Sequence, residues 1–152
     1  MAVTVKPIKL WRKEIENKPG ALAQTLEPLA AEGADLNVVM GYRYPGHEEK
    51  AAIELYPIAN KKLSSAAAAA GLRDASIAAL LVEGDNKPGL GHAITQAIAD
   101  AGINLDFVVA QVMGRRYSAV LGFDSEADLK KAAPLIKKAT PGKRATRNRA
   151  RT

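Results

Sequence analysis

Cysteine is absent from the 152 residues of the sequence, and histidine occurs only twice, at His47 and His92. Without cysteine the chain can form no disulfide, no thiolate metal site and no cysteine nucleophile. Two histidines leave little material for a multi-histidine metal centre or a histidine-based catalytic triad. Dinucleotide-binding, P-loop and serine-hydrolase motifs are missing as well. The sequence therefore predicts a protein that is not an enzyme and that holds neither a metal ion nor a cofactor.

Long apolar runs are also missing. The longest uncharged apolar stretch, residues 75–82, is far shorter than the roughly 20 residues that a membrane-spanning helix needs. The first ten residues lack the charged start and apolar run of a secretory signal. Hydrophobic residues nevertheless make up 47% of the chain, which is enough for a packed core. We expect a soluble, cytoplasmic protein with no membrane partner.

Positive charge is concentrated at the C-terminal end. The net charge is +6, but seven basic residues and no acidic residue follow position 136, so the rest of the chain carries −1. Residues 140–152 contain a Pro-Gly step and no large apolar residue, which predicts a flexible basic tail. Such a tail can improve solubility, or it can bind phosphate or an acidic partner. The remaining chain has too few aromatic residues for a single-strand nucleic-acid surface, so we do not expect nucleic acid as its partner.

A segment of the sequence occurs twice. Residues 14–39 align without a gap with residues 83–108, and each position in the second copy follows its counterpart by 69 residues. The tetrapeptide Asn-Lys-Pro-Gly stands at 17–20 and again at 86–89. Further along, Gly33 precedes Asp35 as Gly102 precedes Asn104. A repeat of this length predicts two copies of one structural unit.

Each copy reads as strand, helix, strand, strand, helix. We expect Pro19 and Pro88 at the first helical position, where the missing N–H has no cost. Gly33 and Gly102 are expected to end the same helices in the left-handed conformation. The predicted strands cover residues 8–16, 36–42, 51–56, 77–83, 105–113 and 117–123, and the later helices cover 63–72 and 125–138.

This order predicts an α+β protein made of two ferredoxin-like βαββαβ units packed side by side. The first unit would cover residues 1–74, the second 75–139, and the tail 140–152. The fourth strand of the second unit is the uncertain element, because only the basic tail follows its last helix. We expect that strand to be short, missing or supplied from elsewhere, for example by residues 2–5. A sheet edge left bare in this way would favour pairing with another chain.

The Asn-Lys-Pro-Gly loop joins a strand to a helix N-terminus, where backbone N–H groups are unpaired and the helix dipole is positive. A carboxylate or a phosphate can bind at such a junction, and Asn17 or Asn86 could orient it. Asp35 and Asn104 follow the far end of the helix, about 15 Å away, so only two neighbouring units could use both ends on one amino acid. In the alternative reading the loop is purely structural, with an asparagine that caps the helix and turn residues at its far end.

Both copies, at residues 16–39 and 85–108, resemble ACT domains, the ferredoxin-like regulatory modules found beside many enzymes of amino-acid metabolism. The shared pattern is Asn/Asp-x-Pro-Gly-x-Leu, an amphipathic helix, and then Gly-x-Asn-Ile. The resemblance covers residues 8–139. It implies that units pair into a continuous sheet and that an amino acid or a similar effector binds between them. It also implies a homodimer or larger assembly and a partner enzyme of amino-acid metabolism.

The resemblance also implies which residues face the ligand. Two of them depart from the family pattern: Asp35 replaces the usual asparagine and would attract an ammonium group but repel a carboxylate, and Gly91 replaces a leucine, which opens space or weakens the helix. The two sites are therefore expected to be unequal. The candidate ligand-binding residues are Asn17, Gly20, Ala21, Asp35, Asn86, Gly89, Leu90, Gly91 and Asn104.

From these observations we expect a non-catalytic regulatory protein that binds a small effector, most simply an amino acid, between ACT-like units. The alternative is an adaptor that binds RNA or an acidic protein through the basic tail. Steep salt dependence of RNA binding, lost on truncation after Ala139, would support that alternative.

Overall fold

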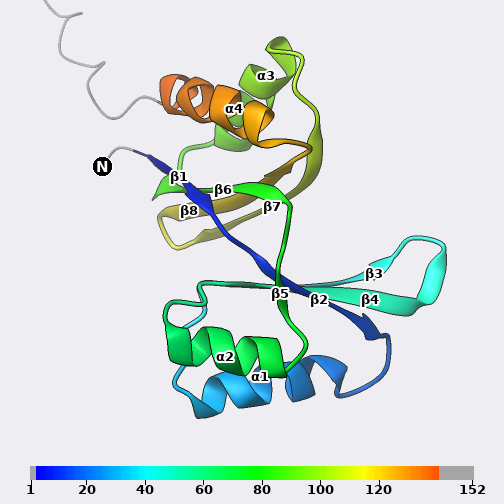
Figure 1. Ribbon diagram of the computed structural model, residues 1–152. Helices are drawn as coiled ribbons and strands as arrows, with labels where there is room; N and C mark the ends of the chain where they lie inside the picture. Colours follow the sequence, from blue (N-terminus) through cyan, green and yellow to red (C-terminus); the bar gives the residue numbers. More distant parts are fainter. Residues whose placement is uncertain (1–2, 141–152) are drawn as a thin grey trace, which may run out of the picture. The chain divides into compact units, whose positions relative to one another are not determined.

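The computed structural model describes residues 3–140 of the chain (Figure 1). The predicted tail therefore lies outside the described residues, apart from Thr140. No helix between residues 3 and 140 is both long and apolar enough to cross a membrane. The elements in chain order are β1 (Thr4–Ile8), β2 (Trp11–Glu16), α1 (Ala21–Ala31), β3 (Val38–Tyr44), β4 (His47–Tyr56), α2 (Lys61–Ala69), β5 (Arg73–Asp74), β6 (Ala78–Asp85), α3 (Leu90–Asp100), β7 (Leu105–Met113), β8 (Arg116–Phe123) and α4 (Glu126–Ala139).

The strands form two antiparallel sheets, with the orders β3-β4-β2-β5 and β1-β6-β8-β7. The chain divides accordingly into two compact units. The first-repeat unit is Lys9–Ser76, and the second-repeat unit runs from Ile77 onward and includes the residues up to Ile8. Both sheets have the strand order of a ferredoxin-like βαββαβ fold. The predicted α+β architecture with two such units is confirmed.

The two units complete their sheets differently. In the first-repeat unit the fourth strand, β5, is only two residues long and pairs with Trp11 and Arg12. In the second-repeat unit no strand follows α4 within the described residues, and β1 lies beside β6 instead, with Thr4 opposite Glu83 and Ile8 opposite Ala79. The expectation that this strand is missing from its own repeat and supplied from elsewhere is confirmed.

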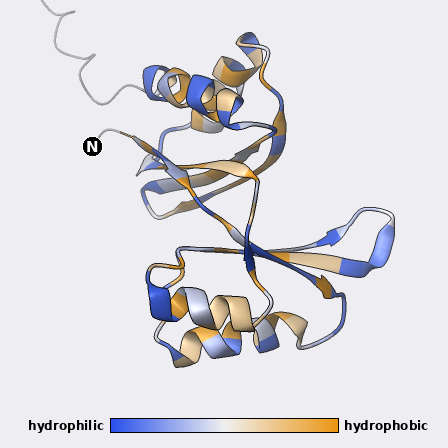
Figure 2. Cartoon of the chain, in the orientation of Figure 1, coloured by the Kyte–Doolittle hydropathy of each residue, from blue (hydrophilic) through white to orange (hydrophobic). Residues whose placement is uncertain are grey.

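The prediction of a single strand over residues 8–16 is wrong, because the chain leaves one sheet and enters the other at Lys9 and Leu10. Strand β1 ends at Ile8 in one sheet, and β2 begins at Trp11 in the other. The predicted turn between β3 and β4 is also too long, since the two strands are separated only by Pro45 and Gly46. Figure 2 shows the hydrophilic colouring of this hairpin at its tip.

The prolines of the repeated loop do not occupy the first helical position, contrary to the prediction. Helices α1 and α3 begin two residues later, after Gly20 and Gly89. Each Pro-Gly pair forms the centre of a turn, in which Ala21 N–H donates to the Lys18 carbonyl (3.3 Å) and Leu90 N–H to the Lys87 carbonyl (3.1 Å). The glycines have φ values of 87° and 84°. These angles define a type II turn, which needs glycine at its third residue and favours proline at its second.

The helix ends agree with the prediction. Gly33 (φ 75°) and Gly102 (φ 71°) follow α1 and α3 in the left-handed conformation. Ala34 N–H reaches back to the Leu29 carbonyl at 3.0 Å, and Ile103 N–H reaches the Ile98 carbonyl at 3.2 Å. This is the Schellman arrangement, which satisfies the last helical carbonyls.

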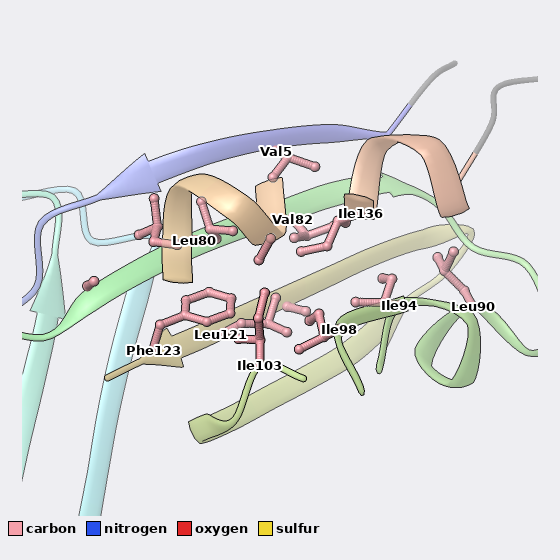
Figure 3. Close-up of a cluster of buried hydrophobic side chains, with 14 of the residues drawn as sticks. Val5, Leu80, Val82, Leu90, Ile94, Ile98, Ile103, Leu121, Phe123 and Ile136 are labelled. Carbon is pink, nitrogen blue, oxygen red and sulfur yellow. The ribbon is translucent and has the colours of Figure 1, made fainter. Parts of the chain in front are cut away.

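Each unit has its own apolar core between its sheet and its two helices. In the first-repeat unit the core is built from β4, α1, α2 and the segment that follows α2, with the buried side chains Leu29, Ile53, Leu55, Ala67 and Leu72. The second-repeat core is larger, and Figure 3 shows side chains of β1, β6, β8, α3 and α4 meeting in it. The labelled residues Val5, Leu80, Val82, Ile94, Ile98, Leu121, Phe123 and Ile136 all belong to this cluster. The repeated loops are thus held at the edges of two separately packed units.

Candidate functional site

The first Asn-Lys-Pro-Gly loop is fastened to the β3–β4 hairpin. Asn17 N–H donates to the Glu49 carbonyl (2.9 Å), and the Asn17 side-chain amide donates to the Glu48 carbonyl (2.8 Å). No side chain caps α1. The alternative that Asn17 caps the helix is therefore wrong. Asn17 does have a structural role, because it fastens the loop to the hairpin. Its amide N–H is already engaged in holding the loop.

The second loop repeats the backbone contact but not the side-chain contact. Asn86 N–H donates to the Arg115 carbonyl at 2.7 Å, in the turn between β7 and β8. The Asn86 side chain is exposed and makes no hydrogen bond to any residue between 3 and 140. Helix α3 also has no side-chain cap. Of the two loop asparagines, Asn86 is thus the one whose whole carboxamide is uncommitted within the described part of the chain.

The unpaired N–H groups lie slightly further along than the sequence suggested. Ala21 and Leu90 were predicted to face a ligand, but both donate their N–H to the preceding turn, and both side chains are buried. Figure 3 shows Leu90 beside Ile94 in the second-repeat core. In the described part of the chain, the next two N–H groups of each helix have no backbone acceptor. They are those of Leu22 and Ala23 in α1 and those of Gly91 and His92 in α3. These groups are the donors that the positive ends of the two helices present.

The three predicted glycines have different roles. Gly20 and Gly89 are exposed and permit the left-handed turn, and an added Cβ would meet no atom within 4 Å at either position. At Gly91 an added Cβ would lie 3.8 Å from the Tyr117 hydroxyl. Tyr117 is buried, and burial raises the pKa of its phenol. Gly91 therefore leaves room next to a phenol that sequence reasoning did not connect with the loop.

Asp35 and Asn104 lie at the other ends of their helices. Both are exposed and follow the left-handed glycines that end α1 and α3. Each helix has 11 residues, which corresponds to about 16 Å at 1.5 Å per residue. Within one unit the structure therefore does not bring Asn17 to Asp35, or Asn86 to Asn104.

A polar cluster on the first-repeat sheet was missed by the sequence analysis. Arg12 of β2 lies directly opposite Glu54 of β4, on the sheet face that points away from the core residues Ile53 and Leu55. Arg12 donates a hydrogen bond to the Tyr44 hydroxyl and stacks over the Tyr44 ring, 5.7 Å from its centroid. The Tyr44 hydroxyl in turn donates to a carboxylate oxygen of Glu14 at 3.4 Å.

Glu54 is the unusual member of this cluster. It is fully buried, and neither of its carboxylate oxygens has a hydrogen-bond partner in the described part of the chain. Burial raises the pKa of Glu54, while the nearby Tyr42 hydroxyl and, to a smaller extent, the positive charge of Arg12 act against the increase. The signal in the sequence was a single acidic residue in an otherwise apolar stretch, residues 51–56. Among residues 3–140, no group of three or more potential ligands could hold a metal ion.

The comparisons with known proteins identify the fold. No protein-family model matches the sequence, and no curated protein matches it. Protein BT0572 from Bacteroides thetaiotaomicron matches with a TM-score of 0.71 at 16% identity, over 88% of this chain and 89% of that one. The ligand-free regulatory subunit of aspartate kinase from Thermus thermophilus matches with a TM-score of 0.61 at 18% identity, over 93% and 99% of the two chains.

A regulatory domain from Porphyromonas gingivalis, described as a putative C-terminal domain of aspartate kinase, matches with a TM-score of 0.57 at 12% identity. It is aligned over 93% of this chain and 97% of its own. These alignments extend over nearly the whole of both chains and confirm the resemblance to tandem ACT-domain proteins at the level of the fold. The matched aspartate kinase structures named here are regulatory subunits or domains.

Proposed function

We propose that this chain is a non-catalytic regulatory protein that binds an amino acid, or a small molecule of similar chemistry, between two ACT-like units. The fold shared with regulatory subunits of aspartate kinase supports a regulatory role. The observation that carries the proposal is the second-repeat loop. There the Asn86 side chain makes no hydrogen bond within the described residues and belongs to the same strand-to-helix junction as the unpaired N–H groups of Gly91 and His92.

The chemistry of this junction suits an amino acid. Backbone N–H groups and the positive end of α3 favour a carboxylate. The carboxamide of Asn86 can donate and accept hydrogen bonds and so fix the orientation of the ligand. The ammonium group of the ligand then needs an acceptor, which the carboxamide oxygen of Asn104 or the carboxylate of Asp35 would provide. Because these residues lie at the far ends of their own helices, a second unit must supply them.

The two loops are not expected to bind equally. Asn17 already donates its amide to the Glu48 carbonyl, so a ligand at the first loop would compete with a hydrogen bond of the fold. Asn86 has no such commitment among residues 3–140. The second-repeat loop is therefore the principal site of this proposal.

Binding between units would also provide the regulatory effect. A ligand that contacts two units stabilises the assembly in which they are adjacent, and it shifts the population toward that state. The proposed assembly is a homodimer or a larger oligomer, and the proposed target is a partner enzyme of amino-acid metabolism.

The test is a thermal-shift experiment on the full chain with each of the twenty amino acids. A ligand present at 100 times its dissociation constant should add about 2.7 kcal/mol to the stability. Asn86→Ala should abolish the shift caused by the active amino acid, and the matched variant Asn17→Ala should keep most of it. The proposal fails if no amino acid changes the melting temperature, or if Asn86→Ala responds like the wild type.

A further inference from the structure

The Tyr117 side chain is buried beside the N-terminus of α3, but its hydroxyl has no partner in the described part of the chain. Only 8% of the residue is exposed, and it belongs to the second-repeat core together with Leu90 and Ile94. Its O–H group makes no hydrogen bond to any residue between 3 and 140. A buried tyrosine usually finds a hydrogen-bond partner for this group. A ligand would provide the partner that residues 3–140 do not.

The hydroxyl lies at the start of α3, next to Gly91. A Cβ added to Gly91 would be 3.8 Å from the Tyr117 oxygen. The N–H groups of Gly91 and His92 have no backbone acceptor within the described residues. Because α3 has 11 residues, its first turn also carries the positive end of a full helix dipole. Three hydrogen-bond donors without acceptors among residues 3–140 therefore meet at one helix end.

The first repeat has a different pair of residues at this place. Leu22 is the counterpart of Gly91, since it stands 69 positions earlier, and Ala51 is the counterpart of Tyr117 in the strand pairing. The first repeat thus has a large residue on the helix and a small one on the strand, and the second repeat has the reverse. Packing alone would be served equally by phenylalanine on the strand. The exchange therefore leaves the O–H group unexplained unless it has a partner outside the described fold.

We propose that the Tyr117 hydroxyl and the N–H groups of Gly91 and His92 form an oxyanion site, which holds the carboxylate of the ligand. The inference rests on the proposed function and deepens it, because it adds a binding residue from β8 and names the group that this residue recognises. Hydrogen bonds from O–H and N–H groups to a carboxylate are about twice as strong as those between neutral groups. The site belongs to the second repeat alone, since Leu22 and Ala51 have no side-chain donor.

The phenol is suited to donate a hydrogen bond at neutral pH. Burial raises the pKa of Tyr117 above the ordinary value of about 10, so the group keeps its proton. A bound carboxylate would hold that proton more firmly, because a nearby negative charge opposes ionisation. Gly91 keeps the hydroxyl accessible, since any larger side chain at this position would begin 3.8 Å from it.

The first test follows the four tyrosines of the full chain by NMR, with a carbon-13 label at the Cζ atom of each phenol. Sodium acetate is the carboxylate probe, and acetamide, which has the same shape without the charge, is the control ligand. Acetate should shift the Tyr117 signal saturably and leave the other three unchanged, and acetamide should shift none. Each of the twenty amino acids is then tested in the same way. The inference is overturned if neither acetate nor any amino acid moves the Tyr117 signal, or if acetamide moves it as much as acetate does.

The second test measures affinity for the same compound through the amide signals of Gly91 and His92. Tyr117→Phe removes only the oxygen atom, so the chain should fold as before and bind at least about tenfold more weakly. Tyr44→Phe is the matched control, because the Tyr44 hydroxyl bonds Arg12 and Glu14 in the first-repeat unit. Its affinity should equal that of the wild type. Unchanged affinity in Tyr117→Phe, or an equal loss in Tyr44→Phe, would contradict the inference.

A double variant tests the exchange of large and small residues between the repeats. Gly91→Leu combined with Tyr117→Ala installs the residue pair with which the first-repeat unit folds. It should keep the circular dichroism of the wild type and bind the compound no better than Tyr117→Phe does. Wild-type affinity in the folded double variant would refute the role of the hydroxyl.

The outcomes separate this inference from the proposed function. If acetate moves the Tyr117 signal and no amino acid does, the oxyanion site is retained and the proposed amino-acid function is refuted. If an amino acid raises the melting temperature but neither moves the Tyr117 signal nor loses affinity in Tyr117→Phe, the inference is refuted and the proposed function is retained.

Discussion

Asn17 and Asn86 hold the same place in the two repeats, but only Asn17 uses its side chain within the described fold. Its amide donates to the Glu48 carbonyl in the hairpin of β3 and β4, while Asn86 meets the corresponding hairpin only through its backbone N–H. The Pro-Gly turns after them are nearly identical, with glycine φ values of 87° and 84°. The repeated tetrapeptide therefore determines the turn, and the neighbouring hairpin determines what the asparagine does.

The sheet faces differ in a similar way. In the first repeat Arg12 lies opposite Glu54, and the counterpart pair in the second repeat is Leu81 opposite Val120. An ionisable pair in one unit thus corresponds to two apolar residues in the other. The second repeat forms the same strand pairing with two apolar residues, so the fold does not require ionisable side chains at these positions. The duplicated scaffold has retained its backbone while its two copies acquired different side-chain chemistry.

The largest expected effect concerns the way each sheet is completed. Deleting residues 1–8 removes β1 from the second-repeat unit, including the buried side chains Val5 and Ile8. At about 1.5–3 kcal/mol for each buried apolar side chain, the unit should lose about 4 kcal/mol of stability. Hydrogen exchange should accelerate in β6 and β8, whereas the fluorescence of the single tryptophan, Trp11 in β2, should still report a folded first-repeat unit. Equal loss of protection in β4 would contradict the independence of the two units.

A smaller effect is expected at one cross-strand pair of each sheet. The larger residue of the pair is on β7 in the second repeat and on β4 in the first. Phe107 lies against Gly122 in the second repeat, and Val38 lies against Tyr56 in the first. A Cβ at Gly122 would overlap the Phe107 ring. Gly122→Ala should therefore cost about 2–3 kcal/mol in urea denaturation, the upper part of the range for overpacking. Adding Phe107→Val should recover most of the loss, and a double variant as unstable as the single one would show that the ring is not the cause.

The loop asparagines provide a smaller contrast. Asn17→Ala removes the hydrogen bond to the Glu48 carbonyl and should lower the stability by about 1 kcal/mol, the usual value for one such bond. Asn86→Ala removes no side-chain hydrogen bond within the described residues and should leave the stability in chemical denaturation unchanged. The comparison is made without ligand. A larger loss in Asn86→Ala than in Asn17→Ala would reverse the assignment of the two roles.

The sequence predicted the features that depend on local chemistry. The position after each Asn-Lys-Pro-Gly loop located α1 and α3, and Gly33 and Gly102 marked their ends because few other residues adopt a positive φ. The proline position was misjudged, since Pro-Gly suits the centre of a type II turn as well as the start of a helix. The run from residue 8 to residue 16 could not be divided between two sheets, because strand pairing depends on residues about 70 positions away. The hydrogen bond of Asn17 to the hairpin was also unpredictable, because its acceptor, the Glu48 carbonyl, belongs to a residue 31 positions away.

The smallest expected effect is a pH dependence at Glu54, whose counterpart in the second repeat, Val120, has no group to titrate. Burial raises the pKa of Glu54, so the folded state binds this proton more tightly than the unfolded state does. The resulting stabilisation is complete below the ordinary glutamate pKa of about 4.3 and is lost as the pH rises through the higher pKa of the folded state. Glu54→Gln cannot lose a proton there, so its stability relative to the wild type should be greater at pH 7 than at pH 4. Urea denaturation at both pH values measures the difference. The prediction fails if the stability difference between the variant and the wild type is the same at pH 4 and pH 7. Glu54 would then titrate alike in the folded and unfolded states, and this position would be as insensitive to pH as Val120 is in the second repeat.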